Sequence, residues 1–292
     1  MSPGNIALAG LFVLIWSSAF TSARFVVLEW PALWALAIRF LLTAPLVAAI
    51  ILGLRGRIRL PRRGDAGRLA LMGAFGTGGY LGCGWFALAT TPSGLVALIS
   101  ATAPLFVAAG ERIFFGRRLT PRAWAGLALG WIGVALLGYW RAAGGLSAAE
   151  TTGILLSIAG ALSQAIGILA YAQVRGRVDA WTSTLGQSMT AGLVLLPVAW
   201  LVEGPAPAAI SLTAAAGMAW SILVVGLAGY ALFFTLMKRL PPSTAAALQL
   251  LSPPVAALLG WALLSERLLP GDILGGLVTL IGLALLFSAK RV

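Results

Sequence analysis

Apolar runs of about 18 or more residues recur along the whole of this 292-residue chain. A helix needs ~20 apolar residues to cross the hydrocarbon core of a bilayer, and a helix in a soluble core does not need that length. Only 10% of the residues are charged, whereas a soluble domain carries about a quarter. A membrane-spanning β-barrel would alternate apolar and polar residues, but these runs are continuous. The chain is therefore predicted to be an all-α membrane protein.

The length of the chain accommodates ten transmembrane helices joined by short loops, because ten spans use ~200 residues. Prolines mark many of the predicted starts, where the missing N–H would have had no partner in any case. The predicted spans are residues ~5–23, ~31–53, ~69–89, ~92–114, ~122–140, ~152–173, ~181–201, ~213–237, ~243–264 and ~270–288.

Basic residues gather in alternate loops between these spans. Of the 20 Lys and Arg residues, 16 fall on the side that holds both termini, three fall on the other side, and Arg39 lies inside a span. Cytoplasmic loops carry an excess of Lys and Arg, so both termini are predicted to be cytoplasmic. Orientation in a lipid bilayer explains the net charge of +12 better than a nucleic-acid partner does, and no such partner is predicted.

The two halves of the chain match at a shift of about 150 residues, which becomes 149 after one deletion. Apolar matches mean little in Leu/Ala-rich segments, so the glycine, proline and tyrosine positions carry the comparison. The matched pairs include Gly76 and Gly226, Gly79 and Gly229, Tyr80 and Tyr230, Pro92 and Pro242, Pro104 and Pro254, Pro121 and Pro270, and Gly133 and Gly282.

This match predicts a five-helix repeat over residues 1–145 and a second over 146–292. Because five is odd, the second unit enters the membrane in the opposite direction, as in inverted-repeat transporters. Such a duplication places a central cavity at the interface between the units, near the bilayer midplane. It also provides two states of similar energy, which is the physical basis of alternating access.

Four segments carry a resemblance to a known family: Trp16-Ser17-Ser18, Ala37-Ile38-Arg39-Phe40, Pro92 to Pro104, and Ser265-Glu266-Arg267-Leu268. With them, essentially the whole chain resembles the EamA-type members of the drug/metabolite transporter superfamily. Within that family it looks most like the amino-acid exporters, including those for aromatic amino acids. The resemblance implies a bacterial inner-membrane exporter of amino acids or related small metabolites. In the first half, Arg117 stands where the second half has Glu266.

Polar atoms are costly in lipid, so the polar residues within spans are expected to face the cavity. The amides could bind an ammonium or a carboxylate, or they could join two helices. The tyrosines could instead anchor at the interface, Trp16 could face lipid, and the serines could bond back to their own helices. The candidate substrate-binding residues are Trp16, Ser17, Tyr80, Ser100, Ser163, Gln164, Tyr171, Tyr230, Gln249 and Ser252.

Arg39 keeps its charge in any protein environment. It could attract a substrate carboxylate or serve as a structural partner of backbone carbonyls. The structural role is favoured because the second span is predicted to be peripheral. Pro104, Pro253 and Pro254 are predicted to break their helices, either as hinges or as rigid bends.

The fifth and tenth spans have few polar residues in their middles and are predicted to lie at the periphery. They carry the motifs Gly126-x-x-x-Gly130 and Gly271-x-x-x-Gly275, which allow helices to approach closely. The spacing alone does not decide between packing within the chain and a dimer contact, and a monomer is favoured.

The chain lacks the residues that metal binding, ATP-driven transport and enzyme catalysis would require. The chain has no histidine and one cysteine, Cys83, and no metal site or cofactor is predicted. No phosphate-binding glycine loop is present to let ATP drive the chain. All eight acidic residues lie at or near predicted span ends, and no clustered acids suggest an enzyme.

The favoured function is therefore export of neutral or aromatic amino acids by alternating access, either as a facilitator or with coupling through something other than a buried acid. The alternative is a proton-coupled exporter of drugs or cationic compounds. That activity would be expected to place a carboxylate in the cavity.

Overall fold

The computed structural model describes residues 3–58, 60–116, 120–143, 147–174, 177–229, 251–267 and 269–288, together with Leu232 and Leu236. Over these residues the chain forms helices and no β-strands. The helices are α1 (Pro3–Val27), α2 (Ala32–Arg55), α3 (Arg63–Leu71), η1 (Met72–Gly79), α4 (Tyr80–Leu88), α5 (Ser93–Ser100), α6 (Ala103–Phe115), α7 (Pro121–Ala143), α8 (Ala148–Ala172), α9 (Ala180–Glu203), α10 (Leu212–Ala219), η2 (Trp220–Gly229), α13 (Ser252–Leu264) and α14 (Pro270–Ser288).

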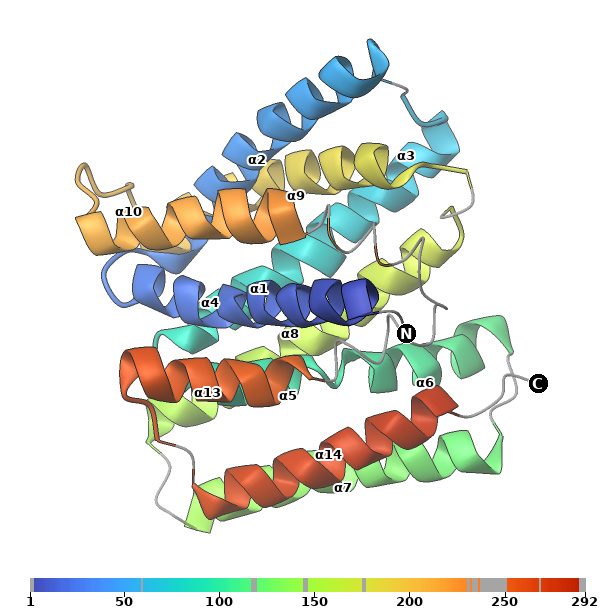
Figure 1. Ribbon diagram of the computed structural model, residues 1–292, viewed down its shortest axis with the longest axis vertical. Coiled ribbons are helices and arrows are strands. Elements are labelled where there is room, and N and C mark those ends of the chain that lie inside the picture. The colour runs from blue at the N-terminus through green and yellow to red at the C-terminus, as the bar shows by residue number, and fades with distance from the viewer. Residues whose placement is uncertain are drawn as a thin grey trace.

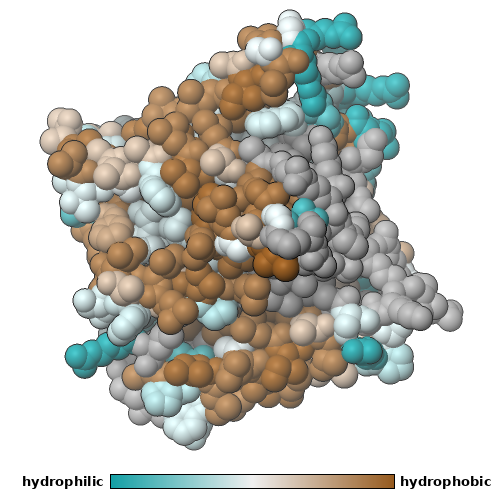
Figure 2. Space-filling model, in the orientation of Figure 1, coloured by the Kyte–Doolittle hydropathy of each residue, from teal (hydrophilic) through white to brown (hydrophobic). Residues whose placement is uncertain are grey.

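Six segments of the described chain are long and apolar enough to cross a membrane. Two shorter apolar helices accompany them, at Ser252–Leu264 and Pro270–Leu286. Figure 2 shows apolar residues covering most of the described surface on the face that it presents, with hydrophilic residues gathered at the margins. The chain is therefore a multi-pass membrane protein. The six spans are Gly4–Val27, Ala32–Arg55, Ser93–Phe115, Ala148–Ala172, Trp181–Glu203 and Leu212–Gly229.

The helices lie side by side with their axes roughly aligned (Figure 1). In that view α2 and α9 lie toward one edge of the bundle, and α7 and α14 form the opposite edge. The start of α1 and the end of α14 lie on the same side of the bundle. Helix α1 packs against α13, α10, η2, α4 and α5.

Helices α7 and α14 pack closely through glycines. A Cβ at Gly126 would lie 2.6 Å from the backbone nitrogen of Leu286, and one at Gly282 would lie 2.7 Å from the Cα of Gly130. A Cβ at Gly133 would meet the carbonyl oxygen of Gly275 at 2.7 Å. The small residues thus allow backbone-to-backbone contact, and this packing lies within one chain.

The span from Ser93 to Phe115 is interrupted rather than smoothly kinked. Helix α5 ends at Ser100, and Pro104 lies in the first turn of α6, where its missing N–H costs nothing. At the break, the backbone nitrogen of Thr102 donates to the carbonyl of Ile99 at 3.0 Å. Pro253 and Pro254 likewise lie in the first turn of α13.

Two segments are π-helical. η1 joins α3 to α4 within one continuous helical run from Arg63 to Leu88, and η2 continues α10. Segments of π-helix are rare and are frequently found at functional sites. η1 contributes to the cavity described next.

Candidate functional site

A cavity of about 280 Å³ lies among α1, α2, the run from η1 to α4, α5, α6, α8 and α9. The first turn of α13 and Val225 of η2 also reach it. Ligand pockets usually occupy ~300–1,000 Å³, so the volume of this cavity lies just below that range. Its size suits a small metabolite better than a large drug.

Glycines allow η1 and α8, which both line the cavity, to pack in direct contact. A Cβ at Gly76 would lie 3.0 Å from the Cα of Gly167, so the two backbones cross in direct contact. This crossing places Gln164 and Ile168 of α8 in the same wall as Thr77 and Gly76 of η1. A larger residue at either glycine would push α8 away from the cavity.

Much of the wall is aromatic. Trp16 and Phe20 come from α1, and Tyr80 and Trp85 come from α4. The ring of Trp16 is held against that of Phe12, with centroids 5.5 Å apart. These rings provide flat apolar surfaces of the kind that bind an apolar or aromatic side chain.

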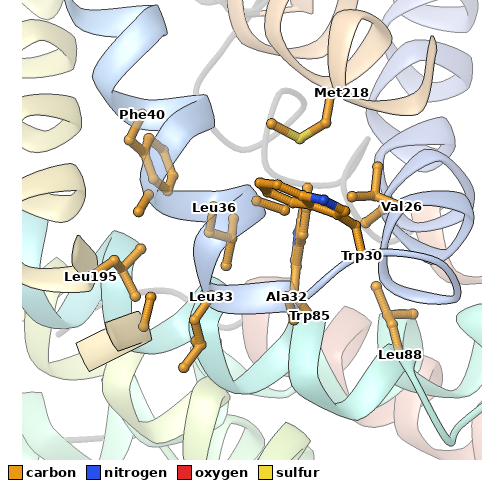
Figure 3. Close-up of a cluster of buried hydrophobic side chains, with 14 of the residues drawn as sticks. Val26, Trp30, Ala32, Leu33, Leu36, Phe40, Trp85, Leu88, Leu195 and Met218 are labelled. Carbon is orange, nitrogen blue, oxygen red and sulfur yellow. The ribbon is translucent and has the colours of Figure 1, made fainter. Parts of the chain in front are cut away.

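Arg39 of α2 also lines the cavity, and its side chain is buried, with 7% of the residue exposed. Its guanidinium carbon lies 5.3 Å from the ring centroid of Phe40 and 5.6 Å from that of Trp85, within cation–π range. Figure 3 shows Phe40 and Trp85 as members of one buried cluster to which α2 and α4 both contribute. Among the lining residues that the structure describes, Arg39 is the one charged residue.

Polar uncharged groups complete the lining. Thr77 donates a hydrogen bond to the amide oxygen of Gln187 at 3.3 Å, which joins η1 to α9. Ser252 is 5% exposed, and its hydroxyl has no hydrogen-bond partner within the described structure. Buried polar groups normally have partners, so the Ser252 hydroxyl is a candidate contact for a bound molecule.

One end of the cavity borders a buried ionic network. Arg24 of α1 lies with its Nε 2.9 Å from Oε1 of Glu266, and it also donates to the backbone carbonyls of Leu88 and Thr91. The backbone N–H and hydroxyl of Ser93 donate to Oε2 of the same glutamate at 2.8 and 2.7 Å. The network ties α1 and the start of α5 to the end of α13. Ala23 and Leu88, beside it, line the cavity.

The structure brings half of the sequence-predicted site residues into this cavity. Ser17 is fully buried away from the lining, Ser163 donates to the carbonyl of Phe75 at 2.8 Å, and Tyr171 bonds the Ser183 hydroxyl at 3.2 Å. Tyr230 and Gln249 lie outside the described residues. The predicted residues that line the cavity are Trp16, Tyr80, Ser100, Gln164 and Ser252.

The predicted hinge prolines are divided between two hollows. Pro104 and Pro253 line the cavity. Pro254, together with Pro253, lines a separate apolar groove among α5, α13 and α14. The helix breaks before α6 and α13 thus both contribute residues to the cavity lining. The role of these prolines as hinges stays a prediction.

Sequence reasoning placed Arg39 in a peripheral helix and missed Gln187 and Trp85. Helix α2 has few polar residues, which is why it looked peripheral, but it packs between α9 and the cavity. An arginine seven residues into a span was itself the available signal, because a charge at that depth needs a polar environment. Gln187 could have been found in the same way, as an amide within the span Trp181–Glu203.

The comparisons with known proteins identify the family of the chain. The model of the EamA-like transporter family matches residues 4–139 and matches again over residues 151–288. The chain belongs to the EamA-like transporter family. Its assignment as a transporter therefore rests on both halves of the sequence.

Three relatives cover most of the chain. "Uncharacterized inner membrane transporter YedA" of Escherichia coli (strain K12) is 28% identical over 265 residues, which are 90% of this chain and 83% of the relative. "Protein PecM" of Dickeya dadantii is 30% identical over 79% of each chain. "Probable terminal-alkyne amino-acid exporter" of Streptantibioticus cattleyicolor is 30% identical over 94% of this chain and 91% of its own length.

The fold of this EamA-like transporter also occurs in an experimentally solved structure. A protein crystal structure aligns over 100% of both chains with a TM-score of 0.65 and 20% sequence identity. At that identity the likeness establishes the shared fold alone.

Proposed function

We propose that this EamA-like transporter exports neutral amino acids, including aromatic ones, across the bacterial inner membrane by alternating access. The composition of the cavity wall carries the proposal. The described lining residues offer aromatic rings, hydroxyls and amides together with one fixed cation, Arg39. A zwitterion with an apolar side chain matches each of these groups.

The same wall argues against the alternative, a proton-coupled exporter of cationic compounds. The lining residues that the structure describes include no aspartate or glutamate. A positive guanidinium repels a cationic substrate, and a proton-coupled carrier would be expected to hold an ionisable acid within the membrane. We therefore propose a facilitator not coupled through a buried acid.

The relative from Streptantibioticus cattleyicolor supports an amino-acid substrate. It is named a "Probable terminal-alkyne amino-acid exporter", and it aligns over 94% of this chain. An alkyne side chain is small and apolar, so the named substrate is a zwitterion with an apolar side chain. The Escherichia coli relative is named as an inner-membrane protein, which supports that location.

We further propose ten transmembrane helices in two inverted repeats, residues 1–145 and 146–292, acting as a monomer. The family model matches once within each half. The π-helical segments end at Gly79 and Gly229, which the 150-residue shift relates. The 149-residue shift also relates two helix ends, at Gly116 and Ser265. Both residues have a left-handed backbone conformation, with φ of 63° and 54°.

The proposed topology places both termini in the cytoplasm. The division of 16 basic residues against three supports that orientation. The start of α1 and the end of α14 lie on the same side of the bundle (Figure 1), which agrees with an even number of spans. A reporter fused to each terminus would test the orientation, and reporters on opposite sides of the membrane would contradict it.

The decisive experiment is efflux from proteoliposomes loaded with labelled phenylalanine, leucine or alanine. Wild-type protein should release at least one of them faster than protein-free liposomes, and collapsing the pH gradient should not stop the release. Gln164→Ala should slow transport, whereas Gln173→Ala, at the end of the same helix and bonded to Arg68, serves as the matched control. Export of a cationic dye without amino-acid efflux would overturn the proposal.

A further inference from the structure

The position of Arg39 points to the chemical group that the cavity recognises. Helix α2 begins at Ala32, so Arg39 lies ~11 Å along the helix at 1.5 Å per residue. A bilayer has a hydrocarbon core of ~30 Å, and a charge at this depth is expensive unless it has a polar environment. Arg39 lines the cavity, so its positive charge is within reach of a molecule that enters the cavity.

The aromatic neighbours orient the guanidinium. Phe40 and Trp85 lie 5.3 and 5.6 Å from its central carbon. Contacts of this kind restrict the orientation of the planar guanidinium. An arginine has five N–H donors, so contacts within the protein and contacts with a ligand are compatible. A carboxylate matches the fork geometry with two parallel hydrogen bonds.

The rest of the wall offers complementary groups for the remainder of the molecule. Gln164 and Tyr80 have oxygens that can accept hydrogen bonds from an ammonium group. Trp16 and Phe20 provide the apolar surface for a side chain. Since none of the described lining residues is an acid, the strongest single electrostatic contact available to a ligand is the one with Arg39.

We propose that Arg39 binds the carboxylate of the transported molecule and thereby restricts the cavity to carboxylate-bearing substrates. This inference rests on the proposed transport function and deepens it. According to this inference, Arg39 determines the preference of the transporter for carboxylates over amides and amines. The interpretation from sequence, in which Arg39 is a structural partner in a peripheral helix, makes a different prediction about substrate choice.

The test uses four probes of similar shape: phenylalanine, its primary amide, 3-phenylpropionate and phenethylamine. Each is measured by counterflow in proteoliposomes containing the full-length protein. Wild-type protein should transport phenylalanine and disfavour the amide and the amine. In Arg39→Gln the apparent affinity for phenylalanine should fall roughly 10- to 100-fold, as expected for the loss of a charge-assisted hydrogen bond, while transport of the amide changes little.

Arg39→Lys and Arg57→Gln complete the set. Lysine keeps the charge without the planar fork, so it should retain part of the preference for carboxylates. Arg57 is exposed beyond the end of α2, and its substitution should change nothing. Melting temperatures of the ligand-free variants show whether each is folded. Unchanged acid-to-amide ratios in folded Arg39→Gln would overturn the inference and establish the structural role.

The same panel separates this inference from the proposed function. Transport of 3-phenylpropionate without transport of any amino acid would refute amino-acid export and leave the role of Arg39 intact. Equal transport of phenylalanine and its amide by wild-type protein would refute the role of Arg39 and leave amino-acid export intact. Transport of phenethylamine alone would refute both.

Discussion

Arg24 and Glu266 form an ion pair between α1 and the residue two positions beyond α13, with the Nε of Arg24 2.9 Å from Oε1 of Glu266. Both side chains are largely buried, at 16% and 6% exposure. The carboxylate also accepts two hydrogen bonds from Ser93 at the start of α5. One acidic side chain therefore connects segments from the beginning, middle and end of the chain.

Breaking this pair should destabilise the protein. Glu266→Gln leaves the Arg24 guanidinium buried without its counter-charge, which costs about 3 kcal/mol in comparable buried pairs. Unfolding in mixed detergent micelles containing SDS would measure the loss. The double variant Arg24→Met with Glu266→Met should recover most of it, because neither charge then remains. If the double variant lost as much stability as the two single substitutions together, the two side chains would not interact.

Ser265→Gly should stabilise the protein by about 0.5–1 kcal/mol. Ser265 has a φ of 54° at the end of α13, a conformation that costs L-residues free energy and that glycine adopts readily. The same unfolding assay would measure the gain. Gly116→Ser, at the matching end of α6 with a φ of 63°, should be destabilising by a similar amount. Loss of stability in Ser265→Gly would contradict this account.

Gly282→Val should separate α7 from α14. A Cβ at this position already lies 2.7 Å from the Cα of Gly130, so a branched side chain cannot fit without moving a helix. Overpacking of this kind costs about 1–3 kcal/mol. Gly10→Ala is the control, since a Cβ there meets no atom within 4 Å. If the two variants unfold alike, the close approach of α7 and α14 is wrong.

Asp65 should make the stability depend on pH at the acidic end of the range. Arg177 donates to both carboxylate oxygens of Asp65, at 2.6 to 3.2 Å, and these hydrogen bonds hold the pKa of the carboxyl below its usual value. A depressed pKa contributes stability that is complete above the unfolded-state pKa of ~3.9 and is lost as the pH falls below it. Melting temperatures should therefore fall below about pH 4.

Asp65→Asn is the matched variant for that measurement. It should melt earlier than wild-type protein at neutral pH and show a shallower decline on acidification. Parallel melting curves for the two proteins across the acidic range would show that Asp65 makes no such contribution.

The helical fold and much of the cavity could be predicted from the sequence, because apolar runs and buried polar residues report directly on lipid exposure. Trp16, Tyr80, Ser100, Gln164 and Ser252 were predicted on that basis and line the cavity. Ser163 and Tyr171 are polar for another reason, since each bonds a group on a neighbouring segment. A single sequence does not distinguish a hydroxyl that joins two helices from one that faces a cavity.

The position of Arg39 depended on packing rather than on composition. Its helix is apolar over most of its length, and the packing of α2 against α9, α4 and η2 places Arg39 at the cavity. The π-helical segments are equally invisible in the sequence, because their glycines are compatible with an ordinary α-helix. The glycines matched at a 150-residue shift indicated that the two halves share a structural feature at these positions, but not that this feature is a π-helix.

The wider winding of η1 has a mechanical consequence for Tyr80, the residue that follows it. A return of this segment to α-helical winding by one residue would turn everything beyond it by about 100° relative to α3. Tyr80 would then sweep around the helix axis while α3 kept its place. Rewinding by one residue is a local rearrangement, so a carrier built this way can reorient an aromatic ring without unfolding a span.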